Sequence, residues 1–223
     1  MEPVDSFNSP KVGDARTPSK LEAHILEVEK YIASNTLLRK ELINAKEIFQ
    51  EKTGKFKESN QTYESRINAF LYWFIFDWPC SYVIDRKAPY NIYLDNNPLV
   101  KKPDAIVSSQ IHTLFEFVKI TKKETVLVDL FTGKKVLVPD TETLFGFEKG
   151  CYFEARVLKF GGKHYFAPFF LMHPQQAYRA IRKQIKLIRK QQDKWDPFLL
   201  HLGHLHYKWV NYSNFEVTNI YKF

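Results

Sequence analysis

Apolar positions recur with the period of an α-helix in the first quarter of the chain. Two sets of residues share this spacing: Leu21, Ile25, Val28 and Ile32, then Leu38, Leu42, Ala45 and Phe49. Steps of three and four residues place each set on one helix face. The register breaks around Asn35, and Gly54 follows the second set. The pattern therefore predicts two helices, or one kinked helix, that begin near Ser19 and end by Gly54.

A dense aromatic run, "FLYWFIFDWP", occupies residues 70–79. The segment from Tyr63 to Asp77 contains no Gly or Pro, which predicts a helix of about four turns. Its aromatic residues point all round such a helix, as expected of an element buried on most sides. The uninterrupted apolar part is far shorter than the roughly 20 residues that cross a bilayer. We expect a core helix in which Arg66 and Asp77 need polar partners.

Short runs rich in Val, Phe, Tyr and Ile follow in the middle of the chain. They cover residues 114–120, 125–130, 135–138, 152–160 and 164–171, with turn signals between them. Five antiparallel strands of this length favour a small β-barrel or a strongly bent sheet. In the longest connection, residues 139–150, we expect Leu144, Phe145 and Phe147 to fold back over one end. The predicted fold class is α+β, with helices packed on this antiparallel unit.

Three short motifs resemble a group of uncharacterised bacterial proteins. These are Trp73-Phe74-Ile75-Phe76-Asp77, Thr113-Leu114-Phe115-Glu116-Phe117 and Asp129-Leu130-Phe131-Thr132-Gly133. The group is characterised by a W-F-x-F-D helix, followed by S-L-F-E-V and D-L-x-T-G in a β-rich segment. Many of its members have Arg after the Asp, where this chain has Trp78. The resemblance spans residues 63–171; it implies a similar helix and sheet arrangement, but no activity and no catalytic residue.

The domain organisation follows from these elements. Residues 1–18 mix Pro, Ser, Gly and Asp without periodicity, which predicts a disordered tail. Residues 19–223 are expected to form a single α+β domain: mainly helical over 19–112, β-barrel-like over 113–172 and mainly helical over 173–223. The chain's first residues contain no signal-peptide core, and Cys80 and Cys151 lie far apart without metal-ligand spacing. We therefore expect a cytoplasmic protein.

The strongest charge feature is the stretch "YRAIRKQIKLIRKQQDKW" at residues 178–195. The chain has a net charge of +8, and this stretch holds seven basic residues against one acid, Asp193. We expect a helix that docks through Ile181, Ile185 and Ile188 and directs its cations outward. The predicted partner-binding residues are Arg179, Arg182, Lys183, Lys186, Arg189 and Lys190.

Clustered cations of this kind attract nucleic acid or another phosphate-rich or acidic partner. Tyr178 or Trp195 is a candidate for additional stacking. The competing interpretation is a solvated helix face whose charges pair with acids such as Glu116, Asp129 or Glu154. The sequence therefore favours a non-catalytic binding or regulatory protein.

Two alternatives come from other classes of protein. The helices over residues 21–49 could act as a homodimerisation adaptor. An unrecognised enzyme could use Cys151 or the C-terminal histidines His201, His204 and His206. On a helix His201 and His204 share a face and His206 does not, so we assign no metal ligands. No phosphate loop, dinucleotide fingerprint or hydrolase elbow occurs, and no cofactor or catalytic residue is assigned. Residues 214–223 are read as a short strand or an aromatic tail packed on the core.

Overall fold

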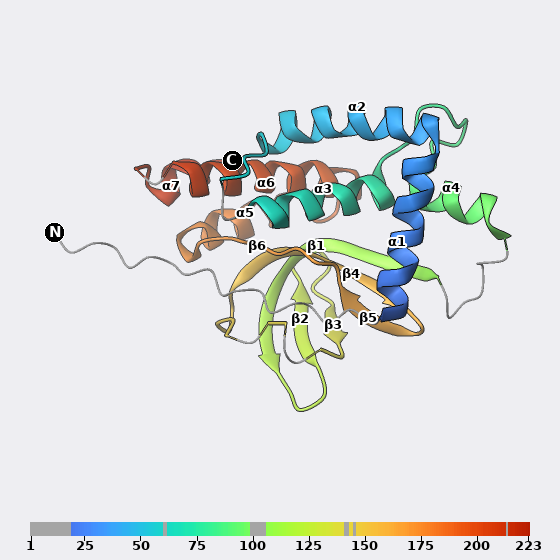
Figure 1. The fold of residues 1–223 in the computed structure, drawn as a ribbon. Helices are drawn as coiled ribbons and strands as arrows, with labels where there is room; N and C mark the ends of the chain where they lie inside the picture. The colour runs from blue at the N-terminus through green and yellow to red at the C-terminus, as the bar shows by residue number, and fades with distance from the viewer. Residues whose placement is uncertain (1–18, 60–61, 99–105, 141–142, 145, 213) are drawn as a thin grey trace.

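A layer of helices covers one face of an antiparallel sheet (Figure 1). The computed structural model describes residues 19–59, 62–98, 106–140, 143–144, 146–212 and 214–223. The predicted tail, residues 1–18, lies outside them. Within these described ranges, four α-helices precede the sheet and three follow it: α1 (Ser19–Ser34), α2 (Thr36–Thr53), α3 (Tyr63–Asp77) and α4 (Pro89–Asn96), then α5 (Tyr178–Ile188), α6 (Trp195–Asn211) and α7 (Val217–Ile220). This arrangement confirms the α+β class.

The first two helices meet at Asn35, where the hydrophobic register breaks. The Asn35 side chain accepts hydrogen bonds from the backbone N–H groups of Leu37 at 2.9 Å and Leu38 at 3.1 Å, so it caps α2. At the other end of α2, Gly54 has a φ of 96°, and a Cβ there would lie 2.5 Å from the Tyr207 ring. Both predicted apolar sets face the interior, with Leu21 and Leu38 fully buried. Of the two predicted forms, two separate helices are confirmed.

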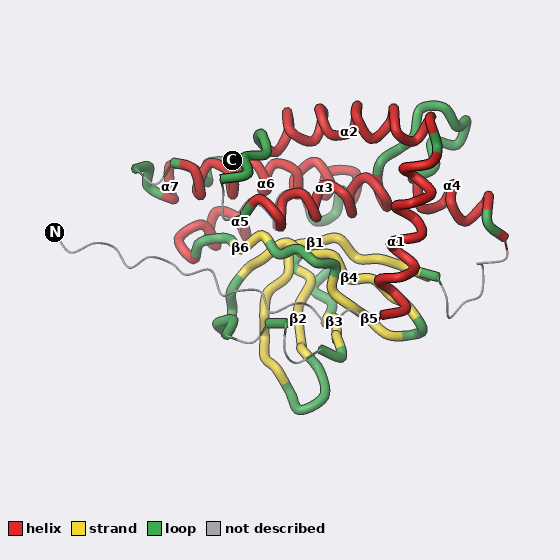
Figure 2. The backbone as a smooth tube through the Cα atoms, in the orientation of Figure 1, coloured by secondary structure: helices red, strands yellow, loops and turns green. Residues whose placement is uncertain are grey.

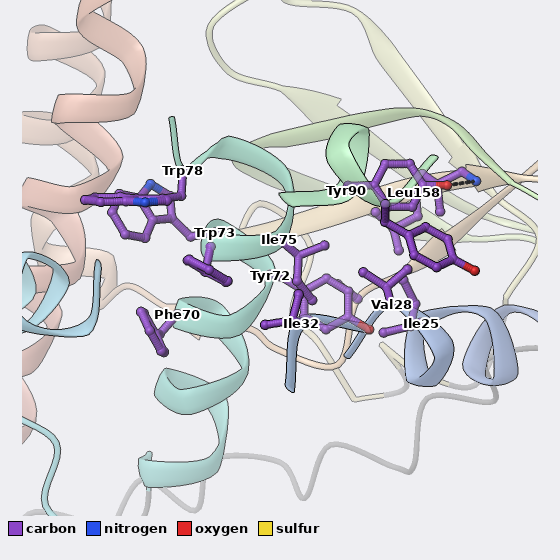
Figure 3. Close-up of a cluster of buried hydrophobic side chains, with 14 of the residues drawn as sticks. Ile25, Val28, Ile32, Phe70, Tyr72, Trp73, Ile75, Trp78, Tyr90 and Leu158 are labelled. Atoms are coloured by element: carbon purple, nitrogen blue, oxygen red, sulfur yellow. Dashed lines mark hydrogen bonds between the residues drawn. The ribbon is translucent and has the colours of Figure 1, made fainter. Parts of the chain in front are cut away.

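The aromatic helix α3 belongs to the helical layer, and Figure 3 shows its buried side chains. On one side the Trp73 ring packs against Phe49 of α2 at 5.3 Å and against Trp78 at 5.4 Å between ring centroids. On the other side Tyr72 and Ile75 face α1. The predicted core role is thus confirmed. Burial of these large rings stabilises the helical layer.

The sheet is open and strongly bent rather than a closed barrel. Its strands are β1 (Val107–Ile120), β2 (Thr125–Asp129), β3 (Lys135–Val138), β4 (Tyr152–Phe160), β5 (Lys163–Phe166) and β6 (Leu171–Met172). The pairing order is β3-β2-β1-β4-β5, all antiparallel, and β6 pairs separately with β4. Figure 2 shows how the strands curl beneath the helices. Of the two predicted forms, the bent sheet is confirmed.

The concave side of the sheet encloses its own apolar cluster, which includes Phe115, Leu127 and Phe153. The long connection after β3 contributes to this cluster, as predicted. Leu144 is fully buried, and the Phe147 ring lies 5.4 Å from that of Phe153. Phe145, the third residue expected there, lies outside the described residues. The opposite, convex side of β1 and β4 faces the helices.

The C-terminal part differs from the prediction at two places. The basic helix α5 ends at Ile188, and a short 3-10 turn at Gln192–Lys194 leads directly into α6. The stretch 178–195 is therefore not one helix. Near the chain end, the predicted strand is wrong, because Val217–Ile220 forms the short helix α7. The predicted aromatic packing there is confirmed by Tyr221, whose side chain is buried.

The length and composition of the helices bear on membrane insertion. None of those in the described part of the chain combines the length and the apolar content that a bilayer-spanning helix requires. The expectation of a cytoplasmic protein remains a prediction.

Candidate functional site: the basic helix and the polar layer beside it

Helix α5 lies beside the sheet on the same side as α6 and α7 (Figure 2). Its three isoleucines, Ile181, Ile185 and Ile188, are buried in a cluster shared with α6 and with the convex side of β1 and β4. All six predicted partner-binding residues are exposed: Arg179, Arg182, Lys183, Lys186, Arg189 and Lys190. The structure thus brings together the cations that the sequence grouped. Arg189 and Lys190 follow the helix end rather than lying within it.

One of these cations has a carboxylate partner. Arg182 Nη2 lies 2.9 Å from Glu116 Oε2 of β1, and the Arg182 guanidinium stacks over the Tyr152 ring at 5.4 Å. Both partners remain accessible, with 56% of the Arg182 side chain and 27% of the Glu116 side chain exposed. Among the described residues, none of the other five cations forms an ion pair with a carboxylate. Glu154 and Asp129, which were considered as partners, are buried elsewhere.

The two aromatic residues proposed for stacking are already engaged within the chain. Tyr178 stacks on Tyr152 at 4.0 Å between centroids, and its hydroxyl accepts a hydrogen bond from the Tyr152 N–H. Trp195 stacks on Phe131 at 5.0 Å, and its indole N–H donates to the Ile188 carbonyl at 3.3 Å. Each ring therefore has one face covered. These contacts hold α5 and the residues after it against the rest of the domain.

The Trp195 contacts join the end of α5 to a turn of the sheet that carries a further exposed lysine. Phe131 belongs to the turn between β2 and β3, which Asp129 stabilises by accepting bonds from the Phe131 N–H at 2.9 Å and the Thr132 hydroxyl at 2.6 Å. Exposed Lys134 lies in the same turn. The Phe131–Trp195 stack brings this turn to the C-terminal end of α5. No sequence signal linked residues so far apart.

A layer of buried polar side chains lies between α3 and the convex side of the sheet. Arg156 of β4 is fully buried, and its guanidinium pairs with Asp77 at the end of α3. Gln110 of β1 contacts both members of the pair. The aspartate that ends the W-F-x-F-D motif is therefore half of a buried ion pair. The expectation that Asp77 needs a polar partner is confirmed.

A second pair continues this layer. His112 Nε2 lies 2.9 Å from Glu154 Oε1, and His112 Nδ1 lies 3.9 Å from Asp77 Oδ2. At the other end of α3, Arg66 Nη2 donates to the Thr53 carbonyl at 3.0 Å and to the Gly54 carbonyl at 2.7 Å. A cation at these carbonyls complements the negative end of the α2 dipole. Burial lowers the Arg66 pKa to about 10.

The histidines and the cysteine that were considered for a metal-binding or catalytic site do not come together in one place. His201 and His204 stack on one side of α6 at 6.5 Å, while His206 is buried beside His173 at 6.0 Å. In the described part of the chain no three His, Cys, Asp or Glu side chains are placed to hold a metal ion. Cys151 is buried, and burial raises its pKa to about 12. Its sulfur therefore stays a thiol near neutral pH, which disfavours a nucleophilic role.

Comparison with known proteins does not assign the chain to a family. No family model, curated protein or solved structure matches the chain. Functional inference therefore rests on the exposed charge of α5 and on the polar layer. The resemblance to uncharacterised bacterial proteins stays a prediction.

Proposed function

We propose that the protein binds the phosphate backbone of nucleic acid through α5 and the residues that follow it, as a non-catalytic binding or regulatory protein. The observation that carries this proposal is the exposure of the six cations, of which only Arg182 pairs with an acid among the described residues. Clustered, unneutralised cations raise the local concentration of polyanions and supply contacts that do not depend on base sequence.

The spacing of the cations supports a linear polyanion. Arg179, Lys183 and Lys186 follow one another at steps of four and three residues, so they form one row along α5. At a rise of about 1.5 Å per residue this row extends roughly 10 Å, which is comparable with about four successive phosphates of one strand, measured along the duplex axis. Lys190 follows near the end of the row. A row of this kind suits a nucleic-acid backbone better than the irregular carboxylates of an acidic protein surface.

Insertion of α5 into a membrane surface is disfavoured by its packing. An interfacial helix buries its apolar face in lipid. In this chain that face, formed by Ile181, Ile185 and Ile188, is already buried against α6 and the sheet. The cations are therefore presented on a rigid, docked helix.

The first prediction concerns the dependence of binding on salt. With about four phosphate contacts, affinity for random-sequence duplex DNA is expected to fall roughly 100-fold between about 50 and about 200 mM salt. Fluorescence anisotropy with labelled duplex and single-stranded oligonucleotides measures the slope. An affinity that does not change over this range contradicts the proposal.

Charge-reversal variants test whether α5 is responsible. The triple variant Arg179→Glu, Lys183→Glu and Lys186→Glu is expected to abolish binding. The matched control carries Lys119→Glu, Lys122→Glu and Lys123→Glu on the β1–β2 hairpin, where three charge reversals change the net charge by the same amount at exposed positions. Equal losses in the two variants would indicate net charge rather than α5. Binding to polyglutamate but not to DNA or RNA would favour an acidic protein partner.

A second prediction uses the ion pair between Arg182 and Glu116. Glu116→Gln is expected to strengthen nucleic-acid binding several-fold, because it frees Arg182 for a phosphate. The change in unfolding free energy should stay within about 1 kcal/mol, since exposed ion pairs contribute little. Anisotropy and urea denaturation measure the two effects, with Glu124→Gln at the tip of the β1–β2 hairpin as the control. Unchanged or weaker binding would mean that Arg182 does not contact the partner.

The two alternatives are less well supported. The stripe expected to mediate homodimerisation is covered by the same chain, with Leu21, Val28 and Leu38 fully buried. A dimer would therefore need the exposed residues of these helices, such as Leu37 and Ile43. Light scattering tests this directly. The enzyme alternative would require a reactive Cys151 or a C-terminal histidine site, and mutation of His201 and His204 tests the latter.

A further inference from the structure

A small cavity lies between the helical layer and the sheet. Its volume is about 10 Å³, which is the space that one water molecule requires. The polar residues of its lining are Thr53, Arg66, His112, Glu154 and Gly203. They come from α2, α3, β1, β4 and α6, so the cavity lies where the two layers of the fold meet.

Two buried polar atoms of this lining have no hydrogen-bond partner among the described residues: Arg66 Nε and Glu154 Oε2. Only 3% of Arg66 and 5% of Glu154 is exposed. Their other polar atoms are occupied, because Glu154 Oε1 contacts His112 and Arg66 Nη2 donates to the end of α2. A buried polar atom without a hydrogen-bond partner destabilises the folded state, and the penalty is larger when the atom belongs to a charged group.

The chemistry of the two atoms restricts what can lie between them. Arg66 Nε–H is a donor and needs an acceptor, whereas the Glu154 carboxylate oxygen needs a donor. A halide cannot donate to the carboxylate, and an ammonium ion has no lone pair for the guanidinium. A metal cation would be repelled by Arg66. A water molecule satisfies both atoms and retains one hydrogen for a third partner.

The Gly203 carbonyl is suited to be that third partner. It lines the cavity, and Arg66 Nη1 reaches it only at 3.5 Å, so its second lone pair is weakly used. We propose that α3, β4 and α6 enclose a specific site for one ordered water molecule, which accepts from Arg66 Nε and donates to Glu154 Oε2 and to Gly203 O. Three hydrogen bonds are typical of a buried water. This water links the helical layer to the sheet.

The unmodified chain provides the first test. A high-resolution crystal structure is expected to contain one solvent peak within hydrogen-bond distance of Arg66 Nε and Glu154 Oε2. Oxygen-17 magnetic relaxation dispersion in solution should count at least one long-lived water. The proposal is overturned if the site contains no peak, or if the two side chains contact each other directly and the cavity is closed.

A pair of matched variants gives an independent readout. Ala69 lines the cavity, and Ala69→Val adds two carbon atoms to that wall, so one long-lived water should be lost from the relaxation count. Ala45→Val makes the same change at a buried helical position that is not part of the lining and should leave the count unchanged. An unchanged count in a folded Ala69→Val variant would contradict the assignment. If neither variant folds, the measurements on the unmodified chain still decide the question.

Discussion

Replacing Asp77 by Ala is expected to lower the free energy of unfolding by about 3–5 kcal/mol. The substitution leaves the guanidinium of Arg156, which is 0% exposed, without its anionic partner between α3 and the sheet. An unpaired buried charge cannot be compensated by water, and the contacts of the guanidinium with Gln110 and with the Phe76 ring are made to neutral groups. Urea denaturation of the unmodified chain and of the variant at neutral pH measures the difference.

The control for this prediction is Glu116→Ala. It also removes a carboxylate from an arginine, but the Arg182 side chain that it leaves is 56% exposed and stays hydrated. Its cost should be at most about 1 kcal/mol. Similar costs for the two variants would show that the Asp77–Arg156 pair is not effectively buried.

A double replacement separates the pair's contribution from the penalty of breaking it. Asp77→Leu combined with Arg156→Met removes both charges and keeps most of the volume. Buried ion pairs are often replaceable by apolar residues without loss, so this variant should recover most of the stability lost by Asp77→Ala. A double variant as unstable as the single one would mean that the pair, rather than its unpaired remnant, determines the stability.

The pair also bears on how α3 is oriented. The rings of α3 contact many neighbours, but apolar contacts are non-directional. The bonds from Arg156 to Asp77 and Gln110 are directional and join the end of α3 to two strands. We therefore infer that the aromatic residues supply most of the stability of this interface, while the polar layer fixes the angle between the helix and the sheet.

The polar layer was not predictable from the strand pattern. In β4, the sequence "YFEARVLKF" alternates in a way typical of a strand with one solvated face, which would expose Glu154 and Arg156. Both are buried, because α3 and α6 cover that face. The same covering explains why β1 begins at Val107 rather than near Leu114. Its first part contains Gln110 and His112, and polar residues at these positions are typical of a loop rather than of a buried strand.

The end of the basic helix was also missed, for a different reason. Residues 178–195 contain no Gly or Pro, so nothing in the sequence stops a helix. In the structure, the Ile188 carbonyl accepts hydrogen bonds from the Gln191 N–H at 2.8 Å and from the Trp195 indole, whose ring stacks on Phe131. A local turn and a tertiary contact thus meet at the helix end. The periodic parts were predictable because the isoleucines of α5 and the apolar sets of α1 and α2 depend only on helix geometry.

Acidification is expected to destabilise the protein strongly below the ordinary histidine pKa of 6.5, because His173 and His206 are buried as neutral side chains. Burial, with a further contribution from Arg66, lowers the His206 pKa to about 3, and burial beside His206 lowers the His173 pKa well below its ordinary value. The unfolded chain binds protons at both positions below pH 6.5, whereas the folded chain does not. The stability that these groups contribute is therefore complete above pH 6.5 and is lost as the pH falls toward the folded pKa values.

Each of the two sites should cost about 1.4 kcal/mol per pH unit below 6.5, so the pair removes roughly 4 kcal/mol by about pH 5. Urea denaturation at a series of pH values measures this slope. His206→Gln, which does not titrate, should reduce it by about half. His201→Gln removes an exposed histidine of the same helix and should leave most of it. Because His173 Nδ1 contacts the Tyr221 hydroxyl at 2.9 Å, hydrogen exchange should detect acid-induced opening first in α7. An undiminished slope in the His206→Gln variant would assign the acid sensitivity to other groups.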